Sequence, residues 1–286
     1  MNIAAFFDID GTLLGPPSLE RRFLRYLRWR GELTATHWAR WLARFLWRAW
    51  RRGLIAKHLA GSSWLAATEA NKAHLAGVRT ATMDAWTASL GRRPLPFFSD
   101  ALQRLEWHAA QGHRIFLVSG TLRPLAEAVA KQLPVPATAC ATELDVRDGC
   151  LAARAVRCWS GEVVGEAISG PGKARGLERL AAEHRIDLGR SYAYDNSWSD
   201  RWMLERVGYP AAVNPSAALA WLAQRRGWPV LAWDRAKTPG TRRDTGPKTR
   251  SVEGAVEGMD KADHRPECAV SEITDPGGQT IEAERR

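Results

Sequence analysis

Four segments of the chain contain carboxylate, hydroxyl or lysine side chains that could take part in a reaction. Asp8 and Asp10 lie in the segment DIDGT, Ser119 lies in SGT, Lys173 opens a helical pattern, and residues 195–200 read DNSWSD. Neighbouring carboxylates can act as nucleophile and proton donor, and a hydroxyl and an ammonium group can hold the oxygens of an anion. These residue types would therefore suit attack on an anionic group.

Each of these segments also has an ordinary structural explanation. An acid pair before a glycine can close a loop as an Asx turn, Ser119-Gly120 can be a simple turn, and Lys173 can be a surface lysine. The four segments follow one another at the ends of predicted elements, and this order favours one shared site.

The elements that would position these segments alternate between strands and helices. Residues 3–9, IAAFFDI, form a short apolar run that ends in acids and a glycine, which is typical of a buried parallel strand. The dipeptide Asp148-Gly149 predicts a hairpin over residues 143–157. We expect further helices at 99–111, 122–133 and 173–184, and strands at 114–118, 192–194, 211–213 and 229–232. This alternation predicts an α/β fold with a doubly wound, mostly parallel sheet, whose reactive groups gather beyond the carboxyl ends of the strands.

Residues 15–98 form a helical insertion between the first two of these segments. Ser18 is predicted to be the N-cap of a helix that opens at Leu19. After Gly31, apolar residues recur at the spacing of an amphipathic helix, with arginines on the opposite side and Trp47 among the arginines. The apolar positions are Trp38, Trp41, Leu42, Phe45, Leu46, Ala49 and Trp50.

The motifs resemble a known family over residues 1 to about 233. The segments FFDIDGTLL, LVSGT, GPGKAR and SYAYDNSWSD are similar, in this order, to the four motifs of the haloacid dehalogenase (HAD) superfamily. The sequence VNP at 213–215 and the place of the helical insertion resemble subfamily IB, which is phosphoserine-phosphatase-like. The resemblance implies a HAD-like Rossmannoid core at 1–14 and 99–234, a helical cap at 15–98, and hydrolysis of a small-molecule phosphomonoester. Phosphoserine and other amino-alcohol or sugar phosphates are the substrates that it suggests.

The resemblance assigns a role to each motif. It implies that Asp8 is the nucleophile and forms an aspartyl-phosphate, while Asp10 protonates the leaving alcohol and then deprotonates the hydrolytic water. An acid at position 10 favours a phosphatase or a phosphomutase over a transport ATPase, which has a threonine there. A phosphate dianion repels a carboxylate, so a cation is needed beside Asp8, and the implied cofactor is Mg²⁺. The implied metal ligands are Asp8, Asp10, Asn196 and Asp200, and the implied phosphate-binding residues are Gly11, Thr12, Ser119, Gly120 and Lys173.

The fourth motif departs from the family pattern at Asn196, where the subfamily has an aspartate that binds magnesium. An amide oxygen can bind a hard cation but brings no charge, so metal affinity should fall. Asp195 is one position early, and adjacent strand residues face opposite sides, so it can substitute only if the loop is shifted. Three outcomes stay open: weaker metal binding, rescue by Asp195, or a catalytically weakened protein that binds phosphate ligands without turnover.

The substrate is less well specified by the sequence. Phosphoserine phosphatases that this chain resembles place a glutamate after the first motif to bind the substrate ammonium. The aligned position here is near Pro17, and Glu20 comes several residues later. The arginine-rich cap could favour an additional anionic group on the substrate.

The charge of the chain is concentrated in the insertion. The formal net charge is +10, and from residue 20 to 58 there are 11 basic against two acidic residues. A basic amphipathic helix at residues 36–52 can pack against the other cap helices or make peripheral contact with an anionic membrane surface. A nucleic-acid partner is the less favoured interpretation, because no known binding module accompanies the basic patch.

The remaining composition bears on compartment and disorder. The cysteines, Cys140, Cys150, Cys158 and Cys268, lack the close spacing of a zinc site, and we expect reduced thiols. The N-terminus has no basic region before an apolar one, so a cytoplasmic protein is expected. Residues 235–286 contain no aromatic side chain and are rich in Gly, Pro, Thr and Glu, which predicts a disordered tail.

Overall fold

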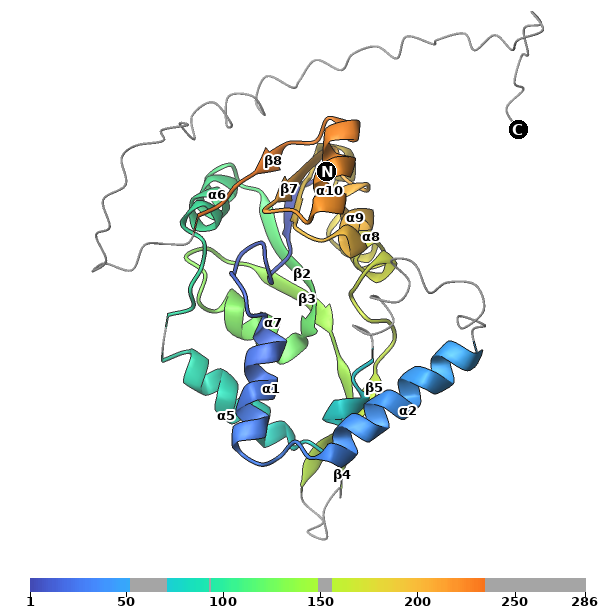
Figure 1. Cartoon of the computed structure of the whole chain (residues 1–286). Helices are drawn as coiled ribbons and strands as arrows, with labels where there is room; N and C mark the ends of the chain where they lie inside the picture. The colour runs from blue at the N-terminus through green and yellow to red at the C-terminus, as the bar shows by residue number, and fades with distance from the viewer. Residues whose placement is uncertain (52–70, 93, 149–155, 235–286) are drawn as a thin grey trace, which may run out of the picture. The chain divides into compact units, whose positions relative to one another are not determined.

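The computed structural model describes residues 1–51, 71–92, 94–148 and 156–234, and these contain a six-stranded sheet (Figure 1). The strands lie in the order β3-β2-β1-β6-β7-β8, and every neighbouring pair is parallel. The predicted α/β class with a doubly wound, mostly parallel sheet is confirmed. The strands are β1 (Ala4–Phe7), β2 (Arg114–Leu122), β3 (Thr138–Thr142), β6 (Tyr192–Asp195), β7 (Tyr209–Val213) and β8 (Val230–Leu231).

Helices cover both faces of this sheet because the central strands carry apolar side chains on both sides (Figure 1). Phe6 of β1 stacks on Phe116 with ring centroids 5.5 Å apart, and both belong to the core formed with α8, α9 and α10. The next residue, Phe7, faces the opposite side and meets His108 of α6. The helices of the core are α6 (Ser99–Ala110), α7 (Arg123–Ala130), α8 (Pro171–His184), α9 (Arg201–Leu204) and α10 (Ala217–Arg226).

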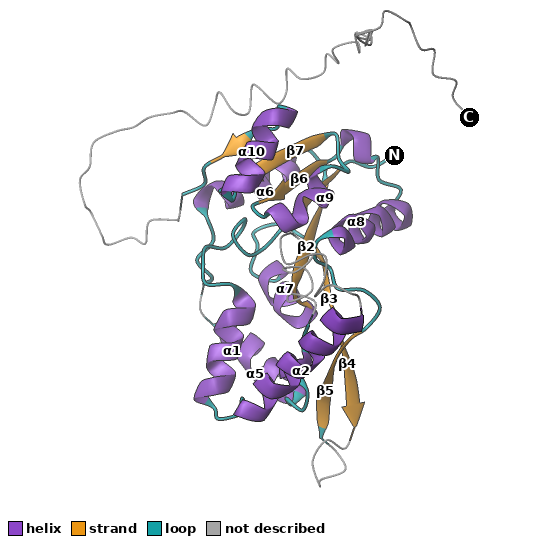
Figure 2. Ribbon diagram, turned by 45° about the vertical axis from the view of Figure 1, so that its right-hand side comes forward, coloured by secondary structure: helices purple, strands orange, loops and turns teal. Residues whose placement is uncertain are grey.

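The insertion after β1 is helical, as predicted, in the part of it that the structure describes (Figure 2). The side chain of Ser18 accepts a hydrogen bond from the backbone of Arg21, which confirms Ser18 as the N-cap of α1. Phe23 of α1 packs against Trp86, and this contact joins two of the helices. The elements are α1 (Leu19–Trp29), α2 (Ala35–Arg51), the 3₁₀ turn η1 (Ala73–Leu75) and α5 (Thr80–Leu90).

A two-stranded antiparallel ribbon, β4 (Leu144–Asp148) and β5 (Arg157–Val163), packs against these cap elements (Figure 2). The predicted pairing of the region is confirmed, but the tight turn at Asp148-Gly149 is wrong, because Asp148 pairs with Arg157. The Asp-Gly dipeptide is only a local signal, whereas the register is set by contacts with the insertion. One such contact is the hydrogen bond from the backbone N–H of Trp159 to the carbonyl of Val78, at 3.0 Å.

Two other expectations need correction. The edge strand β3 was not predicted, because its sequence TACAT consists of small residues with a weak strand signal. The expectation of four reduced thiols holds for Cys140 but is wrong for Cys158, which is buried and disulfide-bonded; Cys150 and Cys268 lie outside the described residues. A disulfide depends on spatial proximity, which the spacing of cysteines in the sequence does not reveal. The predicted tail at 235–286 and the continuation of the cap through 52–70 also lie outside the described residues.

No helix in the described parts of the chain has the length and apolar character needed to span a bilayer.

Candidate active site

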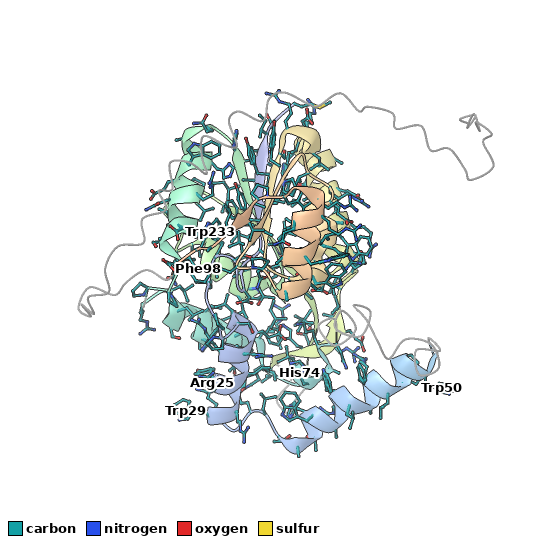
Figure 3. The ribbon with its side chains drawn as sticks, turned by 45° about the horizontal axis from the view of Figure 1, so that its top comes forward. Arg25, Trp29, Trp50, His74, Phe98 and Trp233 are labelled. Atoms are coloured by element: carbon teal, nitrogen blue, oxygen red, sulfur yellow. The ribbon has the colours of Figure 1, made fainter. Side chains whose placement is uncertain are left out.

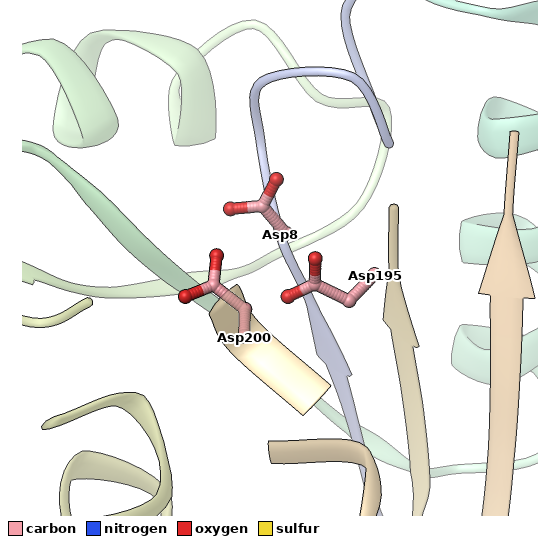
Figure 4. Close-up of side chains that lie close together, drawn as sticks. All are labelled: Asp8, Asp195 and Asp200. Carbon is pink, nitrogen blue, oxygen red and sulfur yellow. The ribbon is translucent and has the colours of Figure 1, made fainter. Parts of the chain in front are cut away.

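Three aspartates and one lysine from different parts of the chain meet at the carboxyl edge of the sheet. Asp8 follows β1, Asp195 ends β6, and Asp200 precedes α9; Figure 4 shows their carboxylates turned toward one another. One oxygen from each of the three carboxylates lies within 4.8 Å of the other two. The Nζ atom of Lys173 lies 2.7 Å from Asp8 Oδ1 and 2.8 Å from an oxygen of each of the other two. The parallel strands β1 and β6 are direct neighbours, which is why residues so distant in sequence come together.

Lys173 reaches the cluster because it stands in the first turn of α8. Gly170 adopts a positive φ of 54° before this helix, and its N–H donates to Asp200 Oδ1 at 2.7 Å. The lysine side chain is 1% exposed. Burial opposes its charge, but the surrounding carboxylates outweigh burial and hold the pKa of Lys173 well above the ordinary value. The lysine therefore carries a permanent positive charge beside Asp8.

The two acids of the first motif have different surroundings. Asp8 is buried, and burial raises its pKa to about 6, although the ammonium group of Lys173 acts in the opposite direction. Asp10 does not contact the lysine; its Oδ1 accepts a hydrogen bond from the backbone N–H of Leu19 at 2.8 Å. Burial raises the pKa of Asp10 to about 6 as well, and the hydrogen bond from Leu19 limits this rise. A carboxyl with a pKa near 6 can both donate and accept a proton close to neutral pH.

A cavity of about 280 Å³ opens above this cluster. The predicted site residues that line it come from all the motifs except the third; they are Asp8, Asp10, Ser119, Gly120, Asn196 and Asp200. Lys173 does not line the cavity. It lies beneath it, paired with Asp8 and Asp200, which do line it. Thr12 is fully buried, and its Oγ1 has no hydrogen-bond partner among the described residues.

Gly11 of the first motif lies directly against the side chain of Asn196. Gly11 has a φ of +97°, and a Cβ built on it would lie 2.7 Å from Cγ of Asn196. Only glycine fits at this position, because the conformation is unfavourable for other residues and no space is left for a side chain. The close contact holds the Asn196 side chain at the cavity wall.

Asp195 and Asn196 thus lie on different sides of the site. Asp195 is fully buried; its Oδ2 pairs with Lys173, and its Oδ1 accepts a hydrogen bond from the backbone of Ser197 at 3.0 Å. Burial acts to raise the pKa of Asp195, and the charge of Lys173 opposes this rise and favours the carboxylate. The carboxylate cluster therefore contains Asp195, for which the sequence allowed only a conditional role, and does not contain Asp10.

The donor atoms that face the cavity suit a hard cation. Asp8 and Asp200 offer carboxylate oxygens, and Asn196 offers an amide oxygen from the same cavity wall. Magnesium prefers oxygen ligands and commonly takes only one or two carboxylates from the protein. The residues present therefore fit Mg²⁺.

Two cap residues also line the cavity: Glu20, which the sequence placed several residues after the expected position, and Lys72, which the sequence did not indicate. Glu20 belongs to the first turn of α1 and forms an ion pair with Lys72, which lies just before η1. Lys72 is only 4% exposed, and the buried ring of His74 lies 3.7 Å from the same glutamate. Burial lowers the pKa of His74 to about 4, so its ring is neutral near pH 7. A lone lysine in the segment EANKAH gives no pattern that predicts this contact.

Comparison with known proteins places these motifs in a family. The family model described as haloacid dehalogenase-like hydrolase matches residues 5–205. The chain is 37% identical over 138 residues to the inhibition of morphological differentiation protein of Streptomyces azureus, a match that covers 48% of this chain and 47% of that protein. It is 34% identical over 125 residues to phosphoserine phosphatase SerB1 of Mycobacterium tuberculosis, which covers 44% of this chain and 38% of the relative. The matched region is therefore less than half the length of either relative.

Solved structures share the fold. A protein of unknown function from Bordetella pertussis Tohama I superposes with a TM-score of 0.60 at 27% identity, covering 80% of this chain and 98% of the other. A phosphoserine phosphatase with a phospho-aspartyl intermediate analogue superposes with a TM-score of 0.52 at 17% identity, over 82% of this chain and 94% of that one.

Proposed function

Because this chain belongs to the haloacid dehalogenase-like hydrolase family, we propose that it is a magnesium-dependent phosphatase that hydrolyses a small phosphomonoester through an aspartyl-phosphate on Asp8. The observation that carries the proposal is the position of Asp8. Its carboxylate lies at the floor of the cavity, paired with Lys173 at 2.7 Å, while Asp10 and Ser119 line the same space. A carboxylate beside a fixed cation is suited to approach a phosphate dianion, which it would otherwise repel.

The reaction proceeds in two displacements at phosphorus. A carboxylate oxygen of Asp8 attacks, the bond from phosphorus to the ester oxygen breaks, and Asp10 gives its proton to the departing alkoxide. Asp10, now ionised, takes a proton from a water molecule that attacks the same phosphorus. The acyl-phosphate bond breaks, and inorganic phosphate and the Asp8 carboxylate are released.

The neighbouring residues orient the phosphoryl group and offset its charge. The hydroxyl of Ser119 and nearby backbone N–H groups donate to the phosphoryl oxygens, and Lys173 adds positive charge from beneath Asp8. Asp8, Asn196 and Asp200 would hold Mg²⁺, which would supply further positive charge to offset that of the phosphate dianion.

The cap supplies the wall that the leaving group would meet. Glu20 and Lys72 bring one negative and one positive charge to the cavity from the cap side. An ammonium group on the leaving group would find Glu20 there, and a carboxylate would find Lys72. This wall supports amino-alcohol and amino-acid phosphates as substrates, phosphoserine among them.

The test is a panel of phosphomonoesters with and without magnesium, measured for the wild type and for Asp8→Asn. We expect metal-dependent hydrolysis that falls at least about a thousandfold in the variant. Absence of hydrolysis by the wild type with every ester would favour a protein that binds phosphate without turnover. Glu20→Gln should raise KM for esters with an ammonium group and leave KM for p-nitrophenyl phosphate unchanged.

The exposed face of α2 supports a second candidate, contact of the cap with an anionic membrane surface. Phe45 is buried, but Leu42 and Leu46 are each about half exposed, Trp47 is 52% exposed and Trp50 is 71% exposed. Figure 3 shows Trp50 at the end of α2 and Trp29 at the end of α1, on the edge away from the sheet. Exposed tryptophan and leucine side chains on a basic helix are typical of helices that lie in a membrane interface. Co-sedimentation with anionic vesicles, weakened by Trp47→Ala with Trp50→Ala, would support this contact; no sedimentation at low salt would exclude it.

A further inference from the structure

The proposed reaction gives no role to Asp195, although this acid is completely buried in the centre of the site. Among the described residues around the cavity, its neighbour Asn196 belongs to the lining and Asp195 does not. The two positions therefore differ in what they can affect. A charge at 196 would face the cavity, whereas the charge at 195 faces the lysine beneath it.

Three carboxylates enclose the ammonium group of Lys173. Asp8, Asp195 and Asp200 each place an oxygen 2.7 to 2.8 Å from its Nζ. Asp8 and Asp195 accept hydrogen bonds from it, and Asp200 forms an ion pair with it. A phosphoryl oxygen can therefore approach the ammonium closely only if one of these carboxylates withdraws.

Asp195 is the partner that does not line the cavity. One of its oxygens accepts from Lys173 and the other from the backbone N–H of Ser197. Asp200 is likewise held at both oxygens, by Lys173 and by the backbone N–H of Gly170, but Asp200 and Asp8 both line the cavity and can be met by a ligand there. When a ligand arrives, Lys173 therefore keeps its contact with Asp195.

We propose that Asp195 is a positioning residue that fixes the Lys173 ammonium against Asp8 and offsets its charge, and that it is not a metal ligand. The inference rests on the proposed function, because that function makes Asn196, and not Asp195, the residue that would contact the cation. With an acid at 195 and an amide at 196, one negative charge lies beside Lys173 instead of facing the cavity. The cavity then attracts a cation less strongly, and Lys173 attracts phosphate less strongly.

The test measures binding rather than turnover, so it is independent of whether the protein proves to be a phosphatase. The full chain, freed of divalent ions, is titrated with Mn²⁺ and the free ion is followed by electron paramagnetic resonance. Inorganic phosphate is titrated separately without metal by calorimetry. The variants are Asp195→Asn and Asn196→Asp, with Asp84→Asn on the exposed face of α5 as a control for the loss of one charge.

We expect Asp195→Asn to leave the Kd for Mn²⁺ within about threefold and to tighten phosphate binding about three- to tenfold, because an amide cannot accept from both Lys173 and Ser197. Asn196→Asp should tighten Mn²⁺ binding about tenfold. A loss of tenfold or more in Mn²⁺ affinity in Asp195→Asn, or no gain in phosphate affinity, would overturn the proposal. If Asp195→Asn does not fold, Asn196→Asp still decides, since an unchanged Mn²⁺ affinity would show that position 196 does not face the cation.

Discussion

The backbone N–H of Leu19, the first residue of α1, donates a hydrogen bond to Oδ1 of Asp10 at 2.8 Å. The acid of the first motif is therefore oriented by the helix that begins the cap. The next residue, Glu20, lines the cavity wall opposite the cluster. The position of the cap and the orientation of the proton donor are thus linked through two adjacent residues.

Asp10→Asn should lower kcat by about 10² to 10⁴-fold, because the amide keeps the acceptor for Leu19 but cannot transfer a proton. The loss in kcat/KM, which reports the displacement of the alcohol, should be smaller for p-nitrophenyl phosphate, whose leaving group needs little protonation, than for an alkyl phosphate. Steady-state kinetics with both esters measures this, with Asp84→Asn as the control. Equal losses in kcat/KM for the two esters would argue against a role as proton donor.

Magnesium should stabilise the protein more at pH 8 than at pH 5. The pKa values of Asp8 and Asp10 rise from 3.8 to about 6 on folding, so without metal their contribution to stability decreases as pH rises through that window. Above pH 6 Asp8 is ionised and free to bind the cation, whereas at pH 5 a proton competes with it. Thermal unfolding with and without magnesium at the two pH values tests this. Asp8→Asn should remove most of the pH dependence, and equal shifts in the wild type would contradict the assignment.

The sequence was most informative about the site where the functional residues belong to short motifs with fixed spacing. Asp8, Asp10, Ser119 and Asp200 could be placed after strands and Lys173 at the start of a helix, and the structure brings all of them to one edge of the sheet. Their roles remain proposals, but their proximity follows from strand order, which alternation of elements predicts well.

Contacts between distant segments could not be predicted in the same way. The position of Asp195 beneath Lys173 depends on how the chain leaves β6, and the pairing of Glu20 with Lys72 joins residues 52 positions apart. The start of β5 at Arg157 depends on its contact with the cap. None of these leaves a periodic pattern in the sequence.

Gly11→Ala should reduce activity because of a steric clash rather than backbone strain alone. The added methyl group would overlap the Asn196 side chain, whose Cγ lies 2.7 Å from the position that the new Cβ would occupy. Gly77→Ala is the matched control, because Gly77 also has a positive φ, +89°, but nothing lies within 4 Å of its Cβ position. We expect each to cost about 1 kcal/mol in stability from φ, and only Gly11→Ala to lower kcat/KM by at least about tenfold. Similar activities of the two variants would show that the contact with Asn196 does not matter.

His108 should make the protein sensitive to acid. Its buried ring is hydrogen-bonded to His113 and to the hydroxyl of Tyr194, each at 2.9 Å, and burial lowers its pKa from 6.5 to about 2. Below pH 6.5 this histidine binds a proton in the unfolded chain but stays neutral in the folded protein. The contribution of the neutral, buried ring to stability is therefore lost as pH falls. Below pH 6 the free energy of unfolding should fall more steeply in the wild type than in His108→Gln, by about 1.4 kcal/mol per pH unit. Urea unfolding at several pH values gives both slopes, and parallel slopes would refute the prediction.

The most direct measurement is chemical trapping of the phosphorylated carboxylate. Enzyme turning over a phosphomonoester with magnesium is quenched in acid and reduced with borohydride, which converts an aspartyl-phosphate into homoserine, and the site is located by peptide mass spectrometry. We expect homoserine at position 8, dependent on substrate and magnesium and absent from Asp8→Asn. Active enzyme that yields no homoserine, or yields it at another aspartate, would contradict Asp8 as the nucleophile.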